Sequence, residues 1–106
     1  MAQLTPDQDP VIRAQAWVGD AVLALYVREW ILSFNKGMID GTLFVEFTSN
    51  NFLRLTGNAT GVEAQIGRIY ESAGLEAAFA WISENLKERM EQRLHILRSR
   101  HPHHRK

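Results

Sequence analysis

Apolar residues recur at three- and four-residue steps along most of the chain, which is the periodicity of helices with one buried face. The first such segment follows Asp9-Pro10, where Asp can accept the free amide hydrogens of a first helical turn and Pro fits the first helical position. Lys36-Gly37 supplies a basic last turn and a left-handed stop. We therefore predict a helix from Pro10 to about Phe34. Its apolar positions are Ala14, Trp17, Val18, Ala21, Val22, Leu25 and Trp30.

Two short helical segments are predicted next, over residues 42–47 and 50–55. Thr48-Ser49 are capping candidates between them, and Thr56-Gly57-Asn58 reads as the break that follows. The β-branched and aromatic residues at 42–48 would also suit a strand.

Two longer helices complete the prediction. One begins at Thr60 and closes at Gly74, and the other begins at Leu75 and carries one apolar stripe for more than twenty residues. Because the chain has no alternating strand pattern and no internal repeat, we predict an all-α fold in a single compact domain. The predicted organisation is a flexible N-terminus over 1–8, the domain over 9–97 and a basic tail over 98–106.

Length and composition restrict the class of protein. A chain of 106 residues buries one core, and 45 % hydrophobic with 23 % charged residues is ordinary composition for a soluble domain. The absence of cysteine excludes a disulfide framework and a thiolate metal site. Asp20, Arg28 and Glu29 interrupt the longest apolar stretches, and the first residues do not resemble a secretory signal. We therefore expect a cytoplasmic protein that does not enter a membrane.

The formal net charge of zero hides an uneven distribution. Residues 1–97 hold eight Lys and Arg against twelve Asp and Glu, whereas 98–106 hold four Lys and Arg and no acid. The end of the chain could contact the phosphates of a nucleic acid, or it could serve only as a solubilising segment. The four cations of this tail are Arg98, Arg100, Arg105 and Lys106.

Asp20 is unusual because its neighbours in the predicted helix are small or apolar. A buried carboxylate without a partner is costly, so Asp20 needs a basic partner, a metal ion or an exposed position at the rim. Gly19 beside it costs about 1 kcal/mol relative to Ala in a helix. This cost indicates that another part of the molecule approaches the backbone closely at that point.

Glu63 has two interpretations. Thr60-x-x-Glu63 at a helix start matches a capping box, in which the Glu side chain accepts a hydrogen bond from the cap amide. Gly67, one turn later, leaves a notch on the same face, where another helix or a hydrated ion could fit. Local spacing does not decide between a cap and a functional acid.

The two segments together resemble the ribonuclease III family. AWVGDAVLAL at 16–25 resembles the signature helix E-F-L-G-D-x-V/I-L, and VEAQIGRIYESAG at 62–74 resembles the second motif, D-x-x-E-A-L-I-G-A-I-Y-x-D-x-G. Between them, residues 40–43 resemble the family's E-G-x-L, and 49–53 its V-S-N-x-x-L. The similarity covers roughly residues 10–85, and the chain is most similar to Mini-ribonuclease III, the short bacterial branch without a separate RNA-binding domain.

The resemblance implies a ribonuclease III-type helical bundle that cleaves double-stranded or structured RNA with Mg²⁺, or with Mn²⁺. Two of the family's four acids carry over, Asp20 and Glu63, which it makes catalytic residues and metal ligands. Ala16 and Thr60 stand at the positions of the other two. The resemblance also implies a homodimer in which Trp17 enters a socket of the partner, and a role in ribosomal RNA maturation.

Duplex RNA would be recognised by its shape, its 2′-hydroxyls and its phosphates. The cations available for this are Arg54, Arg68, Arg98, Arg100, Arg105 and Lys106. Two alternatives stay open. The chain could be a catalytically inactive ribonuclease III-fold module that binds RNA or a protein, as Ala16 and Thr60 would favour. It could also be a helical interaction bundle unrelated to nucleases, with Glu63 as a cap and Asp20 in an ion pair.

Overall fold

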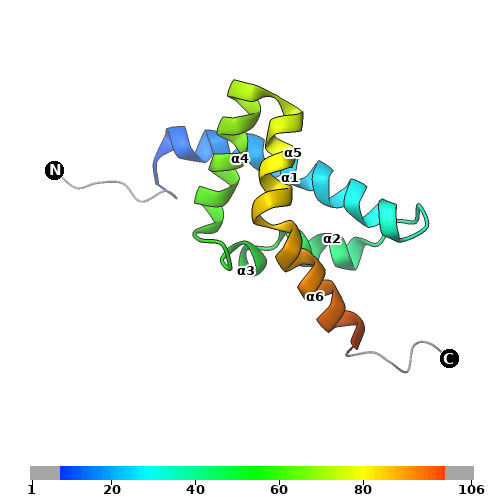
Figure 1. Cartoon of the computed structure of the whole chain (residues 1–106). Coiled ribbons are helices and arrows are strands. Elements are labelled where there is room, and N and C mark those ends of the chain that lie inside the picture. Colours follow the sequence, from blue (N-terminus) through cyan, green and yellow to red (C-terminus); the bar gives the residue numbers. More distant parts are fainter. Residues whose placement is uncertain (1–7, 100–106) are drawn as a thin grey trace.

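The computed structural model describes residues 8–99, which form helices joined by short connections and, within this range, no strand (Figure 1). This confirms the all-α fold class. The predicted flexible N-terminus lies outside the described residues except for Gln8, and so do Arg100, Arg105 and Lys106. The helices are α1 (Pro10–Phe34), α2 (Gly41–Thr48), α3 (Asn50–Leu53), α4 (Ala59–Ala73), α5 (Leu75–Asn85) and α6 (Lys87–Ser99).

The ends of α1 and the start of α3 follow the sequence signals. The Asp9 side chain accepts a hydrogen bond from the Val11 amide at 2.9 Å, and α1 ends before Lys36 and Gly37, which both have positive φ angles. The predicted basic last turn is wrong, because α1 ends at Phe34 and its last turn holds no basic residue. The Ser49 hydroxyl accepts a hydrogen bond from the Phe52 amide at 3.1 Å and so caps α3. These helix boundaries were therefore predictable from local capping chemistry.

Helix α4 begins at Ala59, one position before the predicted start, and its cap lies two positions before the predicted cap Thr60. Asn58 caps this helix, with its side-chain oxygen 2.9 Å from the amide nitrogen of Gly61. Thr60 is consequently the second residue of the helix and not its cap. The capping-box interpretation of Thr60 and Glu63 is excluded, because Asn58 already satisfies the first turn.

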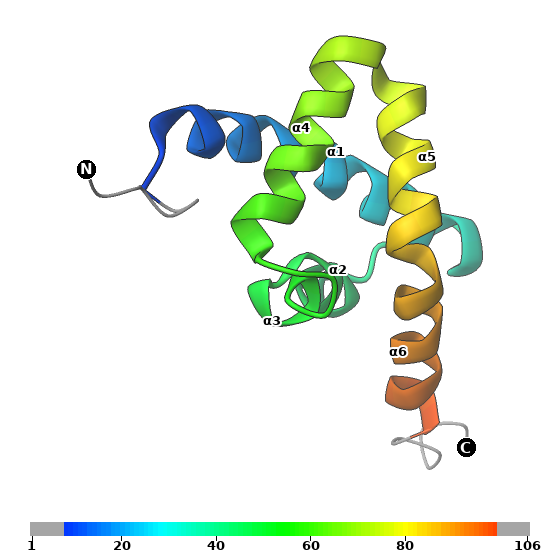
Figure 2. The same cartoon turned by 60° about the vertical axis from the view of Figure 1, so that its left-hand side comes forward.

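The predicted long last helix is divided in two. Leu86, with φ −122° and ψ −28°, separates α5 from α6, and α6 turns away from the direction of α5 (Figure 1). Figure 2 shows the same two helices from another side. The apolar stripe runs through the break, since Ile82, Leu86 and Met90 are all fully buried. Periodicity alone therefore located the buried face but not the interruption.

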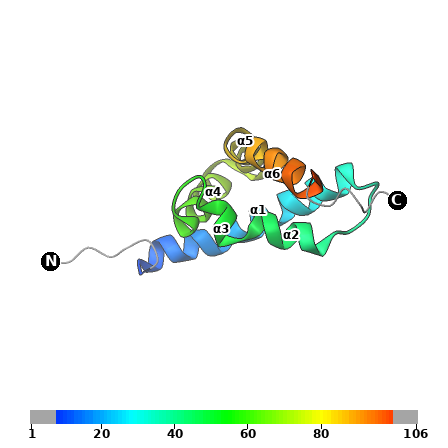
Figure 3. The same cartoon turned by 90° about the horizontal axis from the view of Figure 1, so that it is seen from below.

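The core lies between α1, the longest helix, and the helices gathered along it (Figures 1 and 3). None of the helices within residues 8–99 has the length and apolar character needed to cross a bilayer. The first turns of α1 project beyond the neighbouring helices. The side chains that are fully buried and largest are Phe47, Leu23, Leu53, Ile66, Ile82, Leu86, Met90 and Val27.

Helices α1 and α4 cross in backbone contact at two glycines. A Cβ atom on Gly19 would overlap the carbonyl oxygen of Glu63 and lie 2.7 Å from its carbonyl carbon. A Cβ atom on Gly67 would overlap the carbonyl oxygen of Gln15 and lie 3.1 Å from the Gly19 nitrogen. The close approach expected at Gly19 is thus confirmed, and the notch at Gly67 holds a helix and not an ion.

We predict that Gly19→Ala lowers the free energy of unfolding by about 3 kcal/mol or more, because α1 and α4 would have to separate to admit the methyl group. Gly61→Ala is the matched control. A Cβ atom there meets only Asn58 side-chain atoms at 3.7 Å, so the better helix propensity of Ala should raise stability by up to about 1 kcal/mol. Chemical denaturation of both variants checks the prediction, and equal effects at the two sites would contradict it.

Candidate functional site

The glycine crossing brings two acids from distant parts of the chain together. Asp20 follows Gly19 on α1, and Glu63 on α4 is the residue whose carbonyl group packs against Gly19. The Asp20 carboxylate lies close enough to accept a hydrogen bond from a protonated Glu63. Since the backbones are in contact, the relative position of the two carboxyl groups is set by the fold.

The acids open into a surface hollow of about 410 Å³ formed by residues of α1 and α4. Asp20 is exposed at its rim and Glu63 is half-buried, so solvent and ligands can reach both. Ala16 and Thr60, which replace the other two acids of the motifs described above, line the same hollow. The complete lining is Arg13, Ala16, Trp17, Asp20, Thr60 and Glu63.

The environment of Glu63 disfavours its ionised form. Burial of the side chain, its hydrogen bond with Asp20 and the negative charge of Asp20 together raise the pKa of Glu63 from 4.5 to about 8. Near neutral pH the two carboxyl groups therefore hold a proton between them. A cation that replaced this proton would relieve the repulsion.

Arg13 is the cation that lines this hollow, and it was not among the predicted site residues. It precedes Asp20 by seven positions, a spacing that puts both residues on one face of a helix. That spacing is the signal that could have found it. The one salt bridge within residues 8–99 joins Arg93 to Glu46 at 2.7 Å. Arg13 therefore forms no salt bridge with Asp20 or Glu63.

The other predicted cations lie away from the acids. Arg68 is exposed on α4, where its guanidinium donates hydrogen bonds to the side-chain oxygens of Gln15, at 3.2 Å, and Gln65. Arg54 is exposed at the end of α3, and Arg98 lies in the last turn of α6 with its guanidinium 5.2 Å from the Phe34 ring centre. None of the three lines the acidic hollow.

Trp17 stands beside the acids on the outer surface of α1, with 81 % of its area exposed. It lies between the acidic hollow and a second, mainly apolar hollow of about 610 Å³, which also reaches Asp20. A large exposed aromatic side chain next to an apolar depression is typical of an association surface. The lining of this second hollow is Trp17, Val18, Asp20, Ala21, Val22, Leu25, Tyr70 and Leu75.

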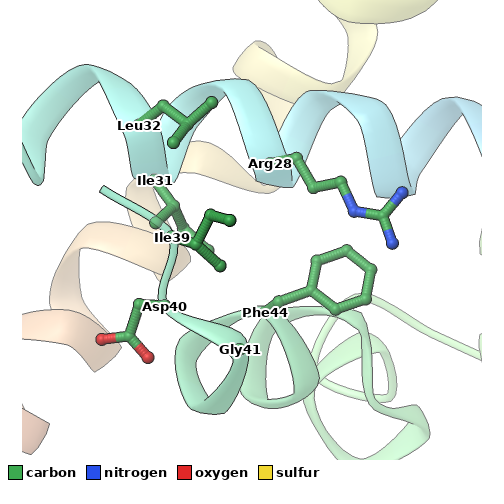
Figure 4. A pocket seen from close by; sticks show the side chains of 7 residues that line it. All are labelled: Arg28, Ile31, Leu32, Ile39, Asp40, Gly41 and Phe44. Carbon is green, nitrogen blue, oxygen red and sulfur yellow. The ribbon is translucent and has the colours of Figure 1, made fainter. Parts of the chain in front are cut away.

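A third hollow, of about 350 Å³, lies between the second half of α1 and the start of α2 (Figure 4). Its two charged residues are already engaged. The Arg28 guanidinium stacks 4.5 Å from the Phe44 ring centre. The Asp40 side chain accepts a hydrogen bond from the Leu43 amide at 3.1 Å and so caps α2. The remaining lining is largely aliphatic, so this hollow offers no acid pair for chemistry.

Asp20 and Glu63 fit a hard divalent cation, which takes oxygen ligands and keeps several waters. Within residues 8–99 neither acid forms a salt bridge. Among residues 8–99 no group of three or more Asp, Glu, His or Cys side chains gathers at one place. A metal here would therefore depend on two carboxylates, with water or a ligand completing its coordination.

We predict that the stability of the metal-free protein falls as the pH rises through the pKa range of Glu63. Below pH 4.5 Glu63 is protonated in both the folded and the unfolded chain, and between pH 4.5 and about 8 only the folded chain keeps the proton. Relative to Glu63→Gln, the wild type should lose about 1 to 2 kcal/mol of unfolding free energy between pH 5 and pH 8, allowing for solvent screening. Denaturation of both proteins in EDTA measures this, and parallel pH profiles would contradict it.

Comparison with known proteins gave no relative. No protein-family model matches the chain, and neither the curated proteins nor the solved structures include a match to it. The functional interpretation therefore depends on the motifs of the sequence and on the geometry of the acidic hollow.

Proposed function

We propose that this chain is a divalent-metal-dependent endoribonuclease of the ribonuclease III type, which cleaves double-stranded or structured RNA. The observation that carries the proposal is the convergence of Asp20 and Glu63 in one accessible hollow. The sequence resemblance independently implies that these two acids are metal ligands. Ribosomal RNA precursors are the substrate that the same resemblance favours.

The arrangement around the two acids supports the resemblance further. The motifs align four positions of this chain with the four carboxylates of the family, and those positions come from two separate segments. All four line the same hollow, and the glycine of each motif lies at the contact between the helices. A shared location of these four positions is what the resemblance predicts. The four positions are Ala16, Asp20, Thr60 and Glu63.

Phosphodiester hydrolysis needs few protein groups at such a site. Bound Mg²⁺ or Mn²⁺ supplies Lewis-acid stabilisation of the negative charge that develops on the phosphate and makes a water molecule more acidic. Asp20 and Glu63 would hold the cation, because they are the two carboxyl groups of the hollow. No nucleophilic side chain is required.

A catalytically inactive module that binds RNA or a protein is the second candidate. It is favoured by Ala16 and Thr60, because the hollow holds two carboxylates where the family motifs have four. Such a module would keep the fold and the association surface while losing hydrolysis. The cleavage assay distinguishes the two candidates.

We predict that the protein cleaves a synthetic RNA duplex in the presence of Mg²⁺ and that EDTA abolishes the reaction. Asp20→Asn should lower kcat by at least about a hundredfold, because one of two metal ligands is lost. Asp40→Asn is the matched control, since it removes the same charge outside the hollow while Asn still caps α2. Gel analysis of the products measures both variants.

Cleavage that persists in EDTA or in Asp20→Asn would overturn the metal-site proposal. Binding of the duplex without cleavage by the wild-type protein would favour the inactive module.

We further propose that the chain forms a homodimer through the surface around Trp17. The exposed indole and the apolar hollow beside it lie on one face, so a two-fold axis would let each copy place its Trp17 in the hollow of the other. The acidic hollows of the two copies would then lie near the same interface, because Asp20 lines both depressions.

We predict that Trp17→Ala shifts the protein from dimer to monomer, with dissociation favoured at least about tenfold, since an anchoring aromatic is removed from the interface. Ile39→Ala is the control, because Ile39 is 88 % exposed but lies outside both hollows. Sedimentation of the variants over a range of concentrations gives the result. A monomeric wild-type protein, or equal behaviour of the two variants, would contradict the proposed interface.

A further inference from the structure

Arg13 is an exposed cation beside an acid pair with which it makes no ion pair. The seven positions between Arg13 and Asp20 correspond to about 10 Å along the helix axis, and the side chains of both residues line the same hollow. A single ligand in the hollow could therefore contact Arg13 and the two acids. The guanidinium of Arg13 makes no salt bridge that would occupy its hydrogen-bond donors.

The backbone of Arg13 is held by the same helix that carries Asp20. It belongs to α1, two turns before the glycine at which α1 touches α4, and its backbone amide donates a hydrogen bond to the Asp9 carbonyl at 2.9 Å. The described cations on the other helices do not line this hollow. Among the cations described above, Arg13 is the one that lines the hollow of the proposed metal ligands.

We propose that Arg13 binds a phosphate of the RNA strand adjacent to the phosphodiester cleaved at Asp20 and Glu63; this inference rests on the proposed function. Two carboxylates repel a polyanion, so a substrate at this hollow needs compensating positive charge outside the metal site. The guanidinium fork matches phosphate oxygens in pairs, which fixes the register of the strand as well as attracting it. Arg13 is a positioning residue that contacts substrate and takes no part in proton transfer.

The experiment compares the wild-type chain with Arg13→Gln, Arg13→Lys and Lys36→Asn. The last variant removes one positive charge at the opposite end of α1, and Asn tolerates the positive φ angle of Lys36. Binding of a synthetic RNA duplex is measured in EDTA over a range of salt concentrations, and cleavage is measured separately with Mg²⁺. Thermal unfolding verifies that all variants fold equally.

Arg13→Gln should reduce the slope of log K against log salt by about one, whereas Lys36→Asn should leave it unchanged. Arg13→Lys should keep the slope, because it keeps the charge, but bind more weakly because the fork is lost. In cleavage, Arg13→Gln should raise KM about fivefold with kcat unchanged, as expected when ground-state and transition-state binding are lost equally.

Equal slopes for Arg13→Gln and Lys36→Asn would overturn the assignment of Arg13, and so would failure of the wild-type protein to bind the duplex. A fall in kcat at constant KM would overturn it too, since Arg13 would then act on the acids and not on substrate. If the slope changes as expected while no protein cleaves RNA, Arg13 stands as a phosphate-binding residue and the nuclease proposal fails.

Discussion

The direct contact of two helix backbones governs this structure. At Gly19 and Gly67 the chains of α1 and α4 approach so closely that a single methyl group on either glycine would overlap the opposing carbonyl group. Neither helix can rotate or slide without losing this contact. The arrangement of every side chain that leaves the crossing, including the two acids, follows from it.

The electrostatics of the hollow depend on how α4 begins. Because Asn58 caps the helix, the Glu63 carboxyl group is not used by the first turn and meets Asp20 instead. Burial and the neighbouring Asp20 raise the pKa of Glu63. Carboxyl pairs without a cationic partner are common at sites that bind cations or transfer protons. The crossing of α1 and α4 therefore leaves an acid pair without a salt bridge in a hollow that solvent can reach.

Most helix ends and the position of the helix contact could be predicted from the sequence, because capping residues and glycines act locally. Three helix ends were predicted correctly, from Asp9, Ser49 and the Lys36-Gly37 pair. Gly19 indicated a close approach of another segment, which the structure identifies as α4. The convergence of Asp20 with Glu63 was accessible through the family resemblance only, since no local pattern relates residues on different helices. The start of α4 was misplaced because Thr60 and Asn58 are both good caps and the choice between them depends on tertiary packing. The division at Leu86 escaped detection because the buried stripe continues through it.

All six residues that line the acidic hollow, the two acids included, belong to α1 and α4, and no loop contributes a side chain. A ligand entering such a site finds its groups already in place, so little conformational entropy is lost by the protein on binding. Any conformational change on binding then has to occur in the ligand. A stiff molecule whose charges are already spaced to match would be selected over a flexible one, and discrimination between substrates would arise from their own shape and rigidity.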